Sequence, residues 1–429
     1  MSQKIEPAAN SRRPIEDILD FCVELSRRMI ISGANLERVS LAVERICRTY
    51  QLTDTSLFLL STHIILSARD SSGFYASRQL TIPPSAIDLT RLSSLNRLCY
   101  TVASVRPSHT KLQMLLDRAS NTKQYRDRIV LLAQICAMSC LCLIFGGWIR
   151  EVICVAMITI MMHYLLILLA IPGIDRILTS AFVMWFSTTA VFFLARLGIS
   201  DREPTIIQTL VMLVLPGIPL VNAMRNLLCG NEMNGILQTA KVTVETMSLA
   251  LGIFLSFHMF GSPAALDKPF VSAITKPFLL VLLSFAASAC FGAVFQIEKK
   301  DLWLAGFGGA LTRIVLLLLT PLLPRLIYMT VSAFAASLYA EFLATVQKKP
   351  STYFVYPAII PLIPGDLFFY TLLGIYTENK EMVMTNGYNC VFSLASMSFG
   401  FVLSFVAAHY FRKIKLKMKW GRRPASLLF

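Results

Sequence analysis

Three ionisable side chains lie near the middle of long apolar segments of this chain, namely Glu245, Arg313 and Asp366. A charge at the centre of a bilayer is costly unless it is paired or wetted, so such residues are candidates for function. A carboxyl group in a low-dielectric environment can titrate near neutral pH. Asp366 or Glu245 could therefore carry a proton.

Two structural alternatives remain open for these charges. Arg313 and Asp366 would neutralise each other if they lie close together in the same bundle. Lys241 and Glu245 are four residues apart, which would allow a pair on one helix surface, although in the less favourable order.

A Pro-Gly pair occurs twice, as Pro216-Gly217 and Pro364-Gly365, 148 residues apart and both inside apolar stretches. Proline removes a backbone donor and glycine loosens a helix, so each pair should break a membrane helix. Lipid tolerates such a break only where protein or a water-filled cavity receives the freed backbone groups. Matching breaks in two halves of a chain are typical of transporters built from repeats.

Polar residues follow both breaks. Asn222 and Arg225 come after the first, where a half-helix end and the guanidinium could bind a carboxylate. Arg225 could also be only a positively charged anchor near the membrane interface. Asp366 directly follows the second break, where charge and unwound backbone coincide. We therefore expect Pro216, Gly217, Pro364 and Gly365 to shape a site for substrate and coupling ion.

The composition indicates an integral membrane protein, because 55% of the 429 residues are hydrophobic and the mean hydropathy is +0.62. Much of the net charge of +15 lies at the chain ends. This placement favours orientation and lipid contact over nucleic-acid binding. The ten cysteines show no metal-ligand spacing. We expect no metal, no cofactor and no catalytic residue.

Residues 1–125 have the pattern of a small cytoplasmic α+β domain. Two amphipathic helices should come first, with Gly33 ending the first one. Strands are predicted over 56–68 and 73–82, joined by a turn at residues 70–73, and two further helices follow.

Ten apolar segments of about the length that a bilayer requires follow the N-terminal domain. Their approximate spans are 129–147, 151–171, 177–195, 205–222, 236–260, 271–295, 302–320, 326–346, 353–375 and 383–411. The fourth is short and the ninth is broken, and these two hold the Pro-Gly pairs. The sequence therefore predicts a mainly α-helical membrane protein.

The positive charges in the connections favour cytoplasmic placement of both termini. The predicted inner side holds Lys299, Lys300, Lys348, Lys349 and a basic C-terminal tail, whereas the outer side holds fewer charges, among them Arg325. Five helices per half is an odd number, so the halves must face opposite ways, as a 5+5 inverted repeat. The first repeat should comprise residues 126–262 and the second residues 263–429.

Three stretches together resemble the threonine/serine exporter family. Residues 32–39 (Ser-Gly-Ala-Asn-Leu-Glu-Arg-Val) are similar to its opening motif, and residues 216–228, followed by Gly230 and Gly235, resemble its membrane signature. Residues 361–365 (Pro-Leu-Ile-Pro-Gly) resemble the corresponding motif of its second membrane module. The likeness covers nearly the whole chain.

The resemblance implies ten transmembrane helices after a cytoplasmic domain and proton-driven export of small hydroxy amino acids. Asn222 and Arg225 match the family pattern, but Asn226 stands where an acidic residue is usual, and Asp366 stands where a small residue is expected. These departures put the usual substrate, or proton coupling at position 226, in doubt. The carboxylate would then have moved from one half to the other.

We therefore expect a multi-pass protein of the bacterial inner (plasma) membrane that exports small amino acids such as threonine and serine. Its partners would be a small amino or carboxylic acid, protons and the lipid bilayer, and a homo-oligomer is compatible with the sequence. An alternative is an exporter of small dicarboxylates such as succinate, because two-chain members of the family resemble dicarboxylate exporters. An intramembrane hydrolase using Asp366 would need a partner acid, for which Asp175 and Glu245 are the candidates.

Overall fold

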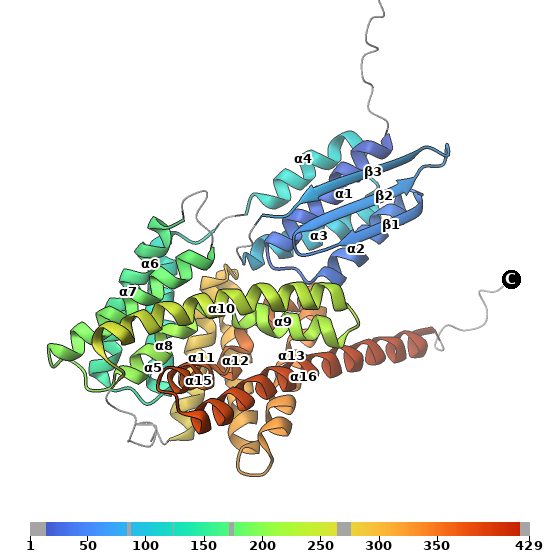
Figure 1. Cartoon of the computed structure of the whole chain (residues 1–429). Coiled ribbons are helices and arrows are strands. Elements are labelled where there is room, and N and C mark those ends of the chain that lie inside the picture. Colours follow the sequence, from blue (N-terminus) through green and yellow to red (C-terminus); the bar gives the residue numbers. More distant parts are fainter. Residues whose placement is uncertain (1–13, 84–86, 123, 171–175, 264–275, 421–429) are drawn as a thin grey trace, which may run out of the picture. The chain divides into compact units, whose positions relative to one another are not determined.

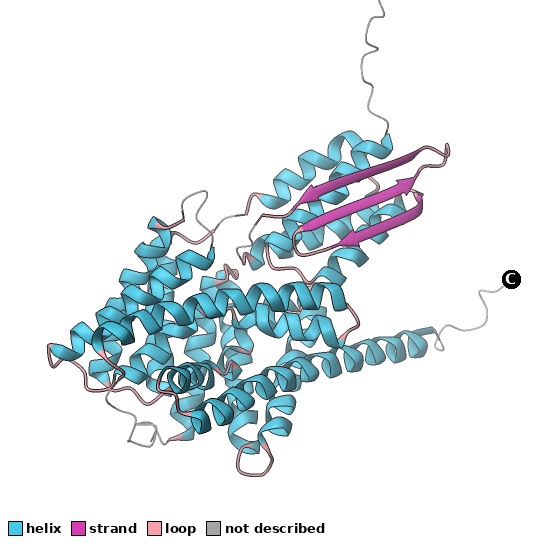
Figure 2. Cartoon of the chain, viewed as in Figure 1, coloured by secondary structure: helices cyan, strands magenta, loops and turns pink. Residues whose placement is uncertain are grey.

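The computed structural model describes residues 14–83, 87–122, 124–170, 176–263 and 276–420, so Asp175 and the end of the predicted basic tail lie outside the described residues. The chain forms two compact units, Met1–Lys123 and Gln124–Phe429. Every strand in the described residues belongs to the first unit, as Figure 2 shows, and the second unit is helical. Each unit is described by itself.

The N-terminal unit contains a three-stranded antiparallel sheet and four helices. The strands are β1 (Thr53–Leu59), β2 (His63–Arg69) and β3 (Tyr75–Thr81), in the order β1-β2-β3. The helices are α1 (Pro14–Ile31), α2 (Leu36–Thr49), α3 (Leu89–Val105) and α4 (His109–Ser120). Helix α1 packs on β2 and β3, and the β2 side chains Ile64, Leu66 and Ala68 are fully buried.

The sheet differs from the prediction in its first strand. Residues 56–68 were expected to form one strand, but the polar pair Ser61-Thr62 turns the chain there, and the Leu60 amide donates to the His63 carbonyl at 2.8 Å. The predicted turn at residues 70–73 is confirmed. The Asp70 carboxylate accepts hydrogen bonds from the Ser72 and Phe74 amides, and Gly73 supplies the positive φ of 84°.

Eight described helices of the second unit are long and apolar enough to cross a membrane, and the count rises to ten if each of two bent pairs is one span. The single spans are α5 (Asp127–Ile144), α6 (Ile149–Leu168), α7 (Arg176–Arg196), α10 (Glu232–Phe260), α11 (Pro277–Val294), α12 (Leu302–Leu319), α13 (Arg325–Gln347) and α16 (Lys380–Trp420). Figure 1 shows α16 as the long red helix.

Both Pro-Gly pairs break a helix, as predicted. Helices α8 (Glu203–Val214) and α9 (Gly217–Leu228) meet at 59°, and α14 (Thr352–Ala358) meets the Ile360–Tyr376 segment, which contains α15 (Gly365–Tyr376), at 41°. The two breaks share one backbone conformation, with ψ of 55° at Pro216 and 58° at Pro364. Proline fixes φ and removes the amide that would continue the helix.

The 148-residue offset continues beyond the breaks. The Gly217 amide donates to the Leu215 carbonyl, and the Gly365 amide donates to the Ile363 carbonyl, at 2.7 and 2.9 Å. Helices α9 and α15 begin at the same offset, and so do α10 and α16. The two breaks and the starts of the helices that follow them therefore recur at one offset, with the same local geometry at the breaks.

Two glycines at this offset allow close helix crossings. A Cβ added at Gly252 of α10 would lie 2.2 Å from the Ala181 carbonyl oxygen of α7. A Cβ added at Gly400 of α16 would lie 2.5 Å from the Thr330 carbonyl oxygen of α13. Small residues let membrane helices approach backbone to backbone. The pairs α7–α10 and α13–α16 are thus equivalent tightly crossed pairs.

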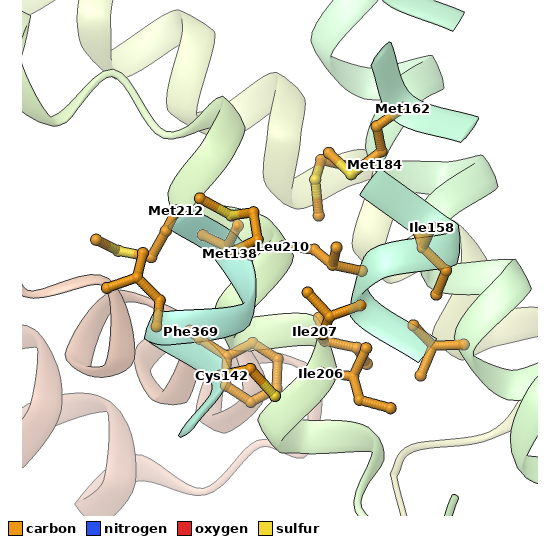
Figure 3. Close-up of a cluster of buried hydrophobic side chains, with 14 of the residues drawn as sticks. Met138, Cys142, Ile158, Met162, Met184, Ile206, Ile207, Leu210, Met212 and Phe369 are labelled. Atoms are coloured by element: carbon orange, nitrogen blue, oxygen red, sulfur yellow. The ribbon is translucent and has the colours of Figure 1, made fainter. Parts of the chain in front are cut away.

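The core of the second unit is a cluster of apolar side chains to which both halves contribute. Figure 3 shows part of it, with Ile206, Ile207 and Leu210 of α8 close to Phe369 of α15. Helices α5 and α11, which hold equivalent places in the two halves, also pack against each other. The halves therefore share one core.

A buried ion cluster connects the start of α12 with the loop after α13. The Lys349 ammonium lies 2.5 Å from Asp301 Oδ2 and 3.1 Å from Glu298 Oε1, and the Tyr353 hydroxyl donates to the same Asp301 oxygen at 3.0 Å. The Lys349 and Asp301 side chains are only 10% and 4% exposed. From the sequence alone, Lys349 indicates only on which side of the membrane its connection lies. In the structure its ammonium is buried and pairs with two acids.

Candidate functional site

The two Pro-Gly breaks lie side by side in the helical unit. A Cβ on Gly217 would come within 2.9 Å of the Ile363 Cγ2 atom, and a Cβ on Gly365 within 2.0 Å of the Met212 Sδ atom. Each glycine therefore gives room to a side chain that precedes the opposite break. Residues distant in sequence thus meet where both helices are unwound.

A cavity of about 220 Å³ adjoins the second break, and we call it the wide cavity. The unwound segment Ile360–Pro364 forms part of its wall. Its polar lining residues are Arg313, Thr320, Arg325, Tyr328 and Asp366.

The wide cavity gathers two guanidinium groups and one carboxylate. The Arg313 Nε donates to the Ser284 hydroxyl at 2.9 Å. No ion pair within 4.0 Å joins Asp366 to Arg313 or Arg325 in the described part of the chain. The two predicted residues Arg313 and Asp366 therefore share a cavity without a direct salt bridge, which leaves both groups available to a charged ligand.

A second cavity lies at the first break and holds only about 20 Å³, so we call it the narrow cavity. That volume accommodates about one water molecule. Its polar lining residues are Asn222, Arg225, Ser337, Glu341, Ser351, Thr352 and Tyr356.

In the wall of the narrow cavity, Asn222 Nδ2 donates a hydrogen bond to the Tyr356 hydroxyl at 3.1 Å, which joins α9 to α14. The Arg225 guanidinium carbon lies 5.9 Å from the centre of the Phe405 ring, and the buried Arg225 Nε has no hydrogen-bond partner among the described residues. One amide and one unpartnered guanidinium donor thus line this small space, together with the acid Glu341.

The two cavities contact opposite ends of helix α13. Arg325 and Tyr328 line the wide cavity, and Ser337 and Glu341 line the narrow one. At 1.5 Å per residue, Arg325 and Glu341 lie about 24 Å apart along that helix. A wide and a narrow cavity therefore lie toward opposite ends of α13, on either side of the two breaks.

Some predicted site residues lie elsewhere. Glu245 is 7% exposed on α10 and lines neither cavity. No ion pair joins it to Lys241 within the described residues. Asn226, at the position where the family usually has an acid, donates from Nδ2 to Gln238 Oε1 at 3.0 Å, toward α10. Asp175, one candidate partner acid of Asp366, lies outside the described residues.

Sequence reasoning missed several polar lining residues, among them Arg325, Glu341 and Tyr356. Arg325 is recognisable from sequence only as a charge in a connection, and Glu341 only as an acid near a helix end. Tyr356 gives no local signal of its own. Only its position pointed to the site, because Tyr356 lies in the short helix that leads into the second break.

The N-terminal unit has a polar cleft of about 590 Å³ between α1, β3 and α4. Its charges pair with one another. Arg78 contacts Asp20 at 2.6 Å and Glu16 at 3.3 Å, and the His109 ring lies 2.8 Å from Asp17. The Arg78 pairs join α1 to the sheet, and the His109–Asp17 pair joins α4 to α1.

Comparison with known proteins agrees with this architecture. The family model described as "Putative threonine/serine exporter" matches residues 20–260, more than half of the chain, and the model described as "Threonine/Serine exporter, ThrE" matches residues 280–407. A "Probable threonine/serine exporter" of Mycobacterium tuberculosis is 21% identical over 371 residues, which cover 82% of this chain and 69% of the relative.

A "Probable succinate transporter subunit YjjP" of Klebsiella aerogenes is 28% identical over 148 residues, which cover 34% of this chain and 57% of that subunit. No solved structure matches the chain. The matches to the family models span both units and both halves of the helical unit. The chain is therefore an integral membrane transport protein that belongs to the threonine/serine exporter family.

Proposed function

We propose that this protein is a secondary active exporter of small amino acids such as threonine and serine, coupled to protons and working by alternating access. The observation that carries the proposal is the pair of Pro-Gly breaks that lie side by side, with a wide and a narrow cavity toward opposite ends of α13. Transporters built from repeats place their sites at such discontinuous helices.

The repeat supports an inverted arrangement of residues 126–262 and 263–429. Equivalent backbone hydrogen bonds and helix starts recur at the 148-residue offset. If each bent pair counts as one span, each half has five, and an odd number reverses the direction of the second half across the membrane.

With both termini in the cytoplasm of a bacterium, the narrow cavity faces the cytoplasm and the wide cavity faces outward. Asn222 and Arg225 bind the substrate carboxylate when the cytoplasmic side opens. Asp366 carries the coupling proton, with Arg313 and Arg325 as nearby positive charges. Glu245 is a second candidate for proton transfer because it is a buried acid of α10.

Export of small dicarboxylates is the second candidate function. The wide cavity has two guanidinium groups and one carboxylate, so protonation of Asp366 would leave two positive charges to receive a dianion. The similarity to a protein named as a succinate transporter subunit points the same way. An intramembrane hydrolase is less well supported, because Asp366 is the only acid among the described residues that line the wide cavity.

Flux from proteoliposomes tests the proposal. Vesicles containing the full chain are loaded with labelled threonine, serine or succinate, and efflux is followed with and without a proton gradient. Amino acid efflux that accelerates with the gradient is expected. Absence of substrate-dependent flux for every compound would contradict the proposal, and flux of succinate alone would favour the second candidate.

The Asp366→Asn variant tests the coupling role in the same vesicles. Efflux should persist down a substrate gradient but no longer respond to the proton gradient. Glu232→Gln, an exposed acid in the first turn of α10, is the matched control. Proton-driven transport by Asp366→Asn would reject the role of Asp366.

A further inference from the structure

Gln208 of α8 is a buried amide without a partner. Its side chain is fully buried, and neither Oε1 nor Nε2 has a hydrogen-bond partner among the described residues. Leaving such a group unpaired away from water is unfavourable, and most buried polar side chains have a partner. The residue is therefore badly accommodated in this conformation.

The 148-residue repeat identifies a counterpart for Gln208. Adding the offset gives Tyr356, and subtracting it from Tyr370 gives Asn222. Asn222 and Tyr356 are the hydrogen-bonded pair in the wall of the narrow cavity. Gln208 is thus the counterpart of Tyr356, and Tyr370 is the counterpart of Asn222. Each pair combines one amide with one phenol, but the amide and the phenol have exchanged places between equivalent helices.

Gln208 and Tyr370 lie on two helices, α8 and α15, that contact each other. Ile207 and Phe369, the immediate neighbours of the two residues, belong to the same buried cluster (Figure 3). Tyr370 is partly buried and packs against that cluster. The Tyr370 hydroxyl makes no hydrogen bond within the described residues. An amide and a phenol can each donate and accept.

The helices that follow the two breaks pack differently. Such a difference is expected if only one of the two equivalent hydrogen bonds forms at a time. Helix α9 packs on α16, where the Ser398 hydroxyl donates to the Val221 carbonyl at 3.1 Å. The counterpart helices α15 and α10 line an apolar groove of about 510 Å³, to which Phe254 and Leu372 contribute. The two halves therefore adopt different arrangements of equivalent helices.

The geometry points to Gln208 and Tyr370 as the positioning pair of the alternate state: they form the equivalent hydrogen bond when the Asn222–Tyr356 bond breaks. The two halves then exchange their arrangements, and the wide cavity closes while the narrow one opens. The inference rests on the proposed alternating access and names the residues that hold its second state.

Thiol labelling of the full chain in lipid vesicles tests this pair without any substrate. Thr320→Cys reports access to the wide cavity, and Ser351→Cys reports access to the narrow one, each in a background with Cys136 and Cys229 replaced by serine. The ratio of the two labelling rates follows the ratio of the two states.

Gln208→Leu should raise the wide-to-narrow labelling ratio by about two- to tenfold, as expected for one net hydrogen bond lost from the alternate state. Tyr370→Phe should act in the same direction, and the double variant should add little to Gln208→Leu. Tyr356→Phe should lower the ratio. Thr209→Val, a buried neighbour whose hydroxyl bonds within its own helix to the Thr205 carbonyl, should leave the ratio unchanged.

An unchanged or lowered ratio in both Gln208→Leu and Tyr370→Phe would overturn the inference, as would full additivity of the two changes. Tyr370→Phe keeps the test decisive if Gln208→Leu fails to fold, because it removes only one oxygen. If the wild type transports none of the tested compounds but the ratio shifts as stated, the proposed substrate class is wrong and the positioning pair remains.

Discussion

The close crossing of α10 over α7 makes Gly252 the most sensitive glycine of the helical unit. A Cβ there would lie 2.2 Å from the Ala181 carbonyl oxygen and 3.0 Å from the Trp185 nitrogen, whereas ordinary contact begins at 3.4 Å. Both opposing atoms belong to the backbone, so no rotamer change relieves the overlap. The Gly252→Ala variant must separate two helices by about 1.2 Å, the difference between 3.4 and 2.2 Å.

The expected loss of stability is about 1–3 kcal/mol from overpacking. Alanine's higher helix propensity offsets at most about 1 kcal/mol of it. Gly400→Ala should cost less than Gly252→Ala, because its Cβ overlap with the Thr330 oxygen is smaller, with a distance of 2.5 Å. Thermal unfolding of the purified protein, followed by tryptophan fluorescence, should show a Tm lowered by a few degrees for each variant.

Gly387→Ala is the matched control within α16. Its Cβ would lie 3.3 Å from the Thr371 Cγ2 atom, a methyl group that can shift, so we expect no loss of stability. Equal Tm values for Gly252→Ala and Gly387→Ala would refute the reasoning, since the backbone overlap would then have no consequence.

Three further predictions concern the charged pairs. Lys349→Met should lower stability by about 3–5 kcal/mol because it leaves the buried Asp301 without its cation, and Asp301→Asn in the same chain should restore much of the loss in a thermal unfolding assay. Partial burial raises the pKa of Glu298, but hydrogen bonds from Lys300 and Lys349 outweigh it and lower the pKa below its ordinary value of 4.5. The stabilisation by Glu298 should therefore be complete above about pH 4.5 and be lost as pH falls through the lowered pKa, so the Tm of Glu298→Gln should fall less on acidification than that of the wild type. Arg78→Met should cost only about 1 kcal/mol in the unfolding of the N-terminal unit, because its side chain is 32% exposed, and a loss as large as that of Lys349→Met would show that exposure is a poor guide here.

The helix breaks could be predicted from sequence because they follow from covalent properties of proline and glycine. The apolar segments could be predicted for a similar reason, since bilayer thickness fixes their length. The predicted bounds of the first strand were wrong because residues 60–62 contain no glycine or proline to mark a turn, and only the hydrogen bond between Leu60 and His63 reveals it.

The composition of the cavities could not be predicted in the same way. Which face of α13 carries Arg325 and Glu341 depends on how that helix is rotated against its neighbours. Asn226 follows the first break as closely as Arg225 does, yet it faces Gln238. Gln208 is an ordinary polar residue in the sequence, and only its burial without a partner distinguishes it.

The packing of α5 against α11 gives the chain the construction of a dimer with its two subunits fused, since equivalent elements meet as they do at an isologous interface. A true dimer would carry every side chain twice. In the fused form each copy can change alone, and Ile218 stands in the first half at the place that Asp366 holds in the second. Under the proposed coupling role of Asp366, this position would therefore supply one proton site per molecule, although the repeat provides two places for the acid.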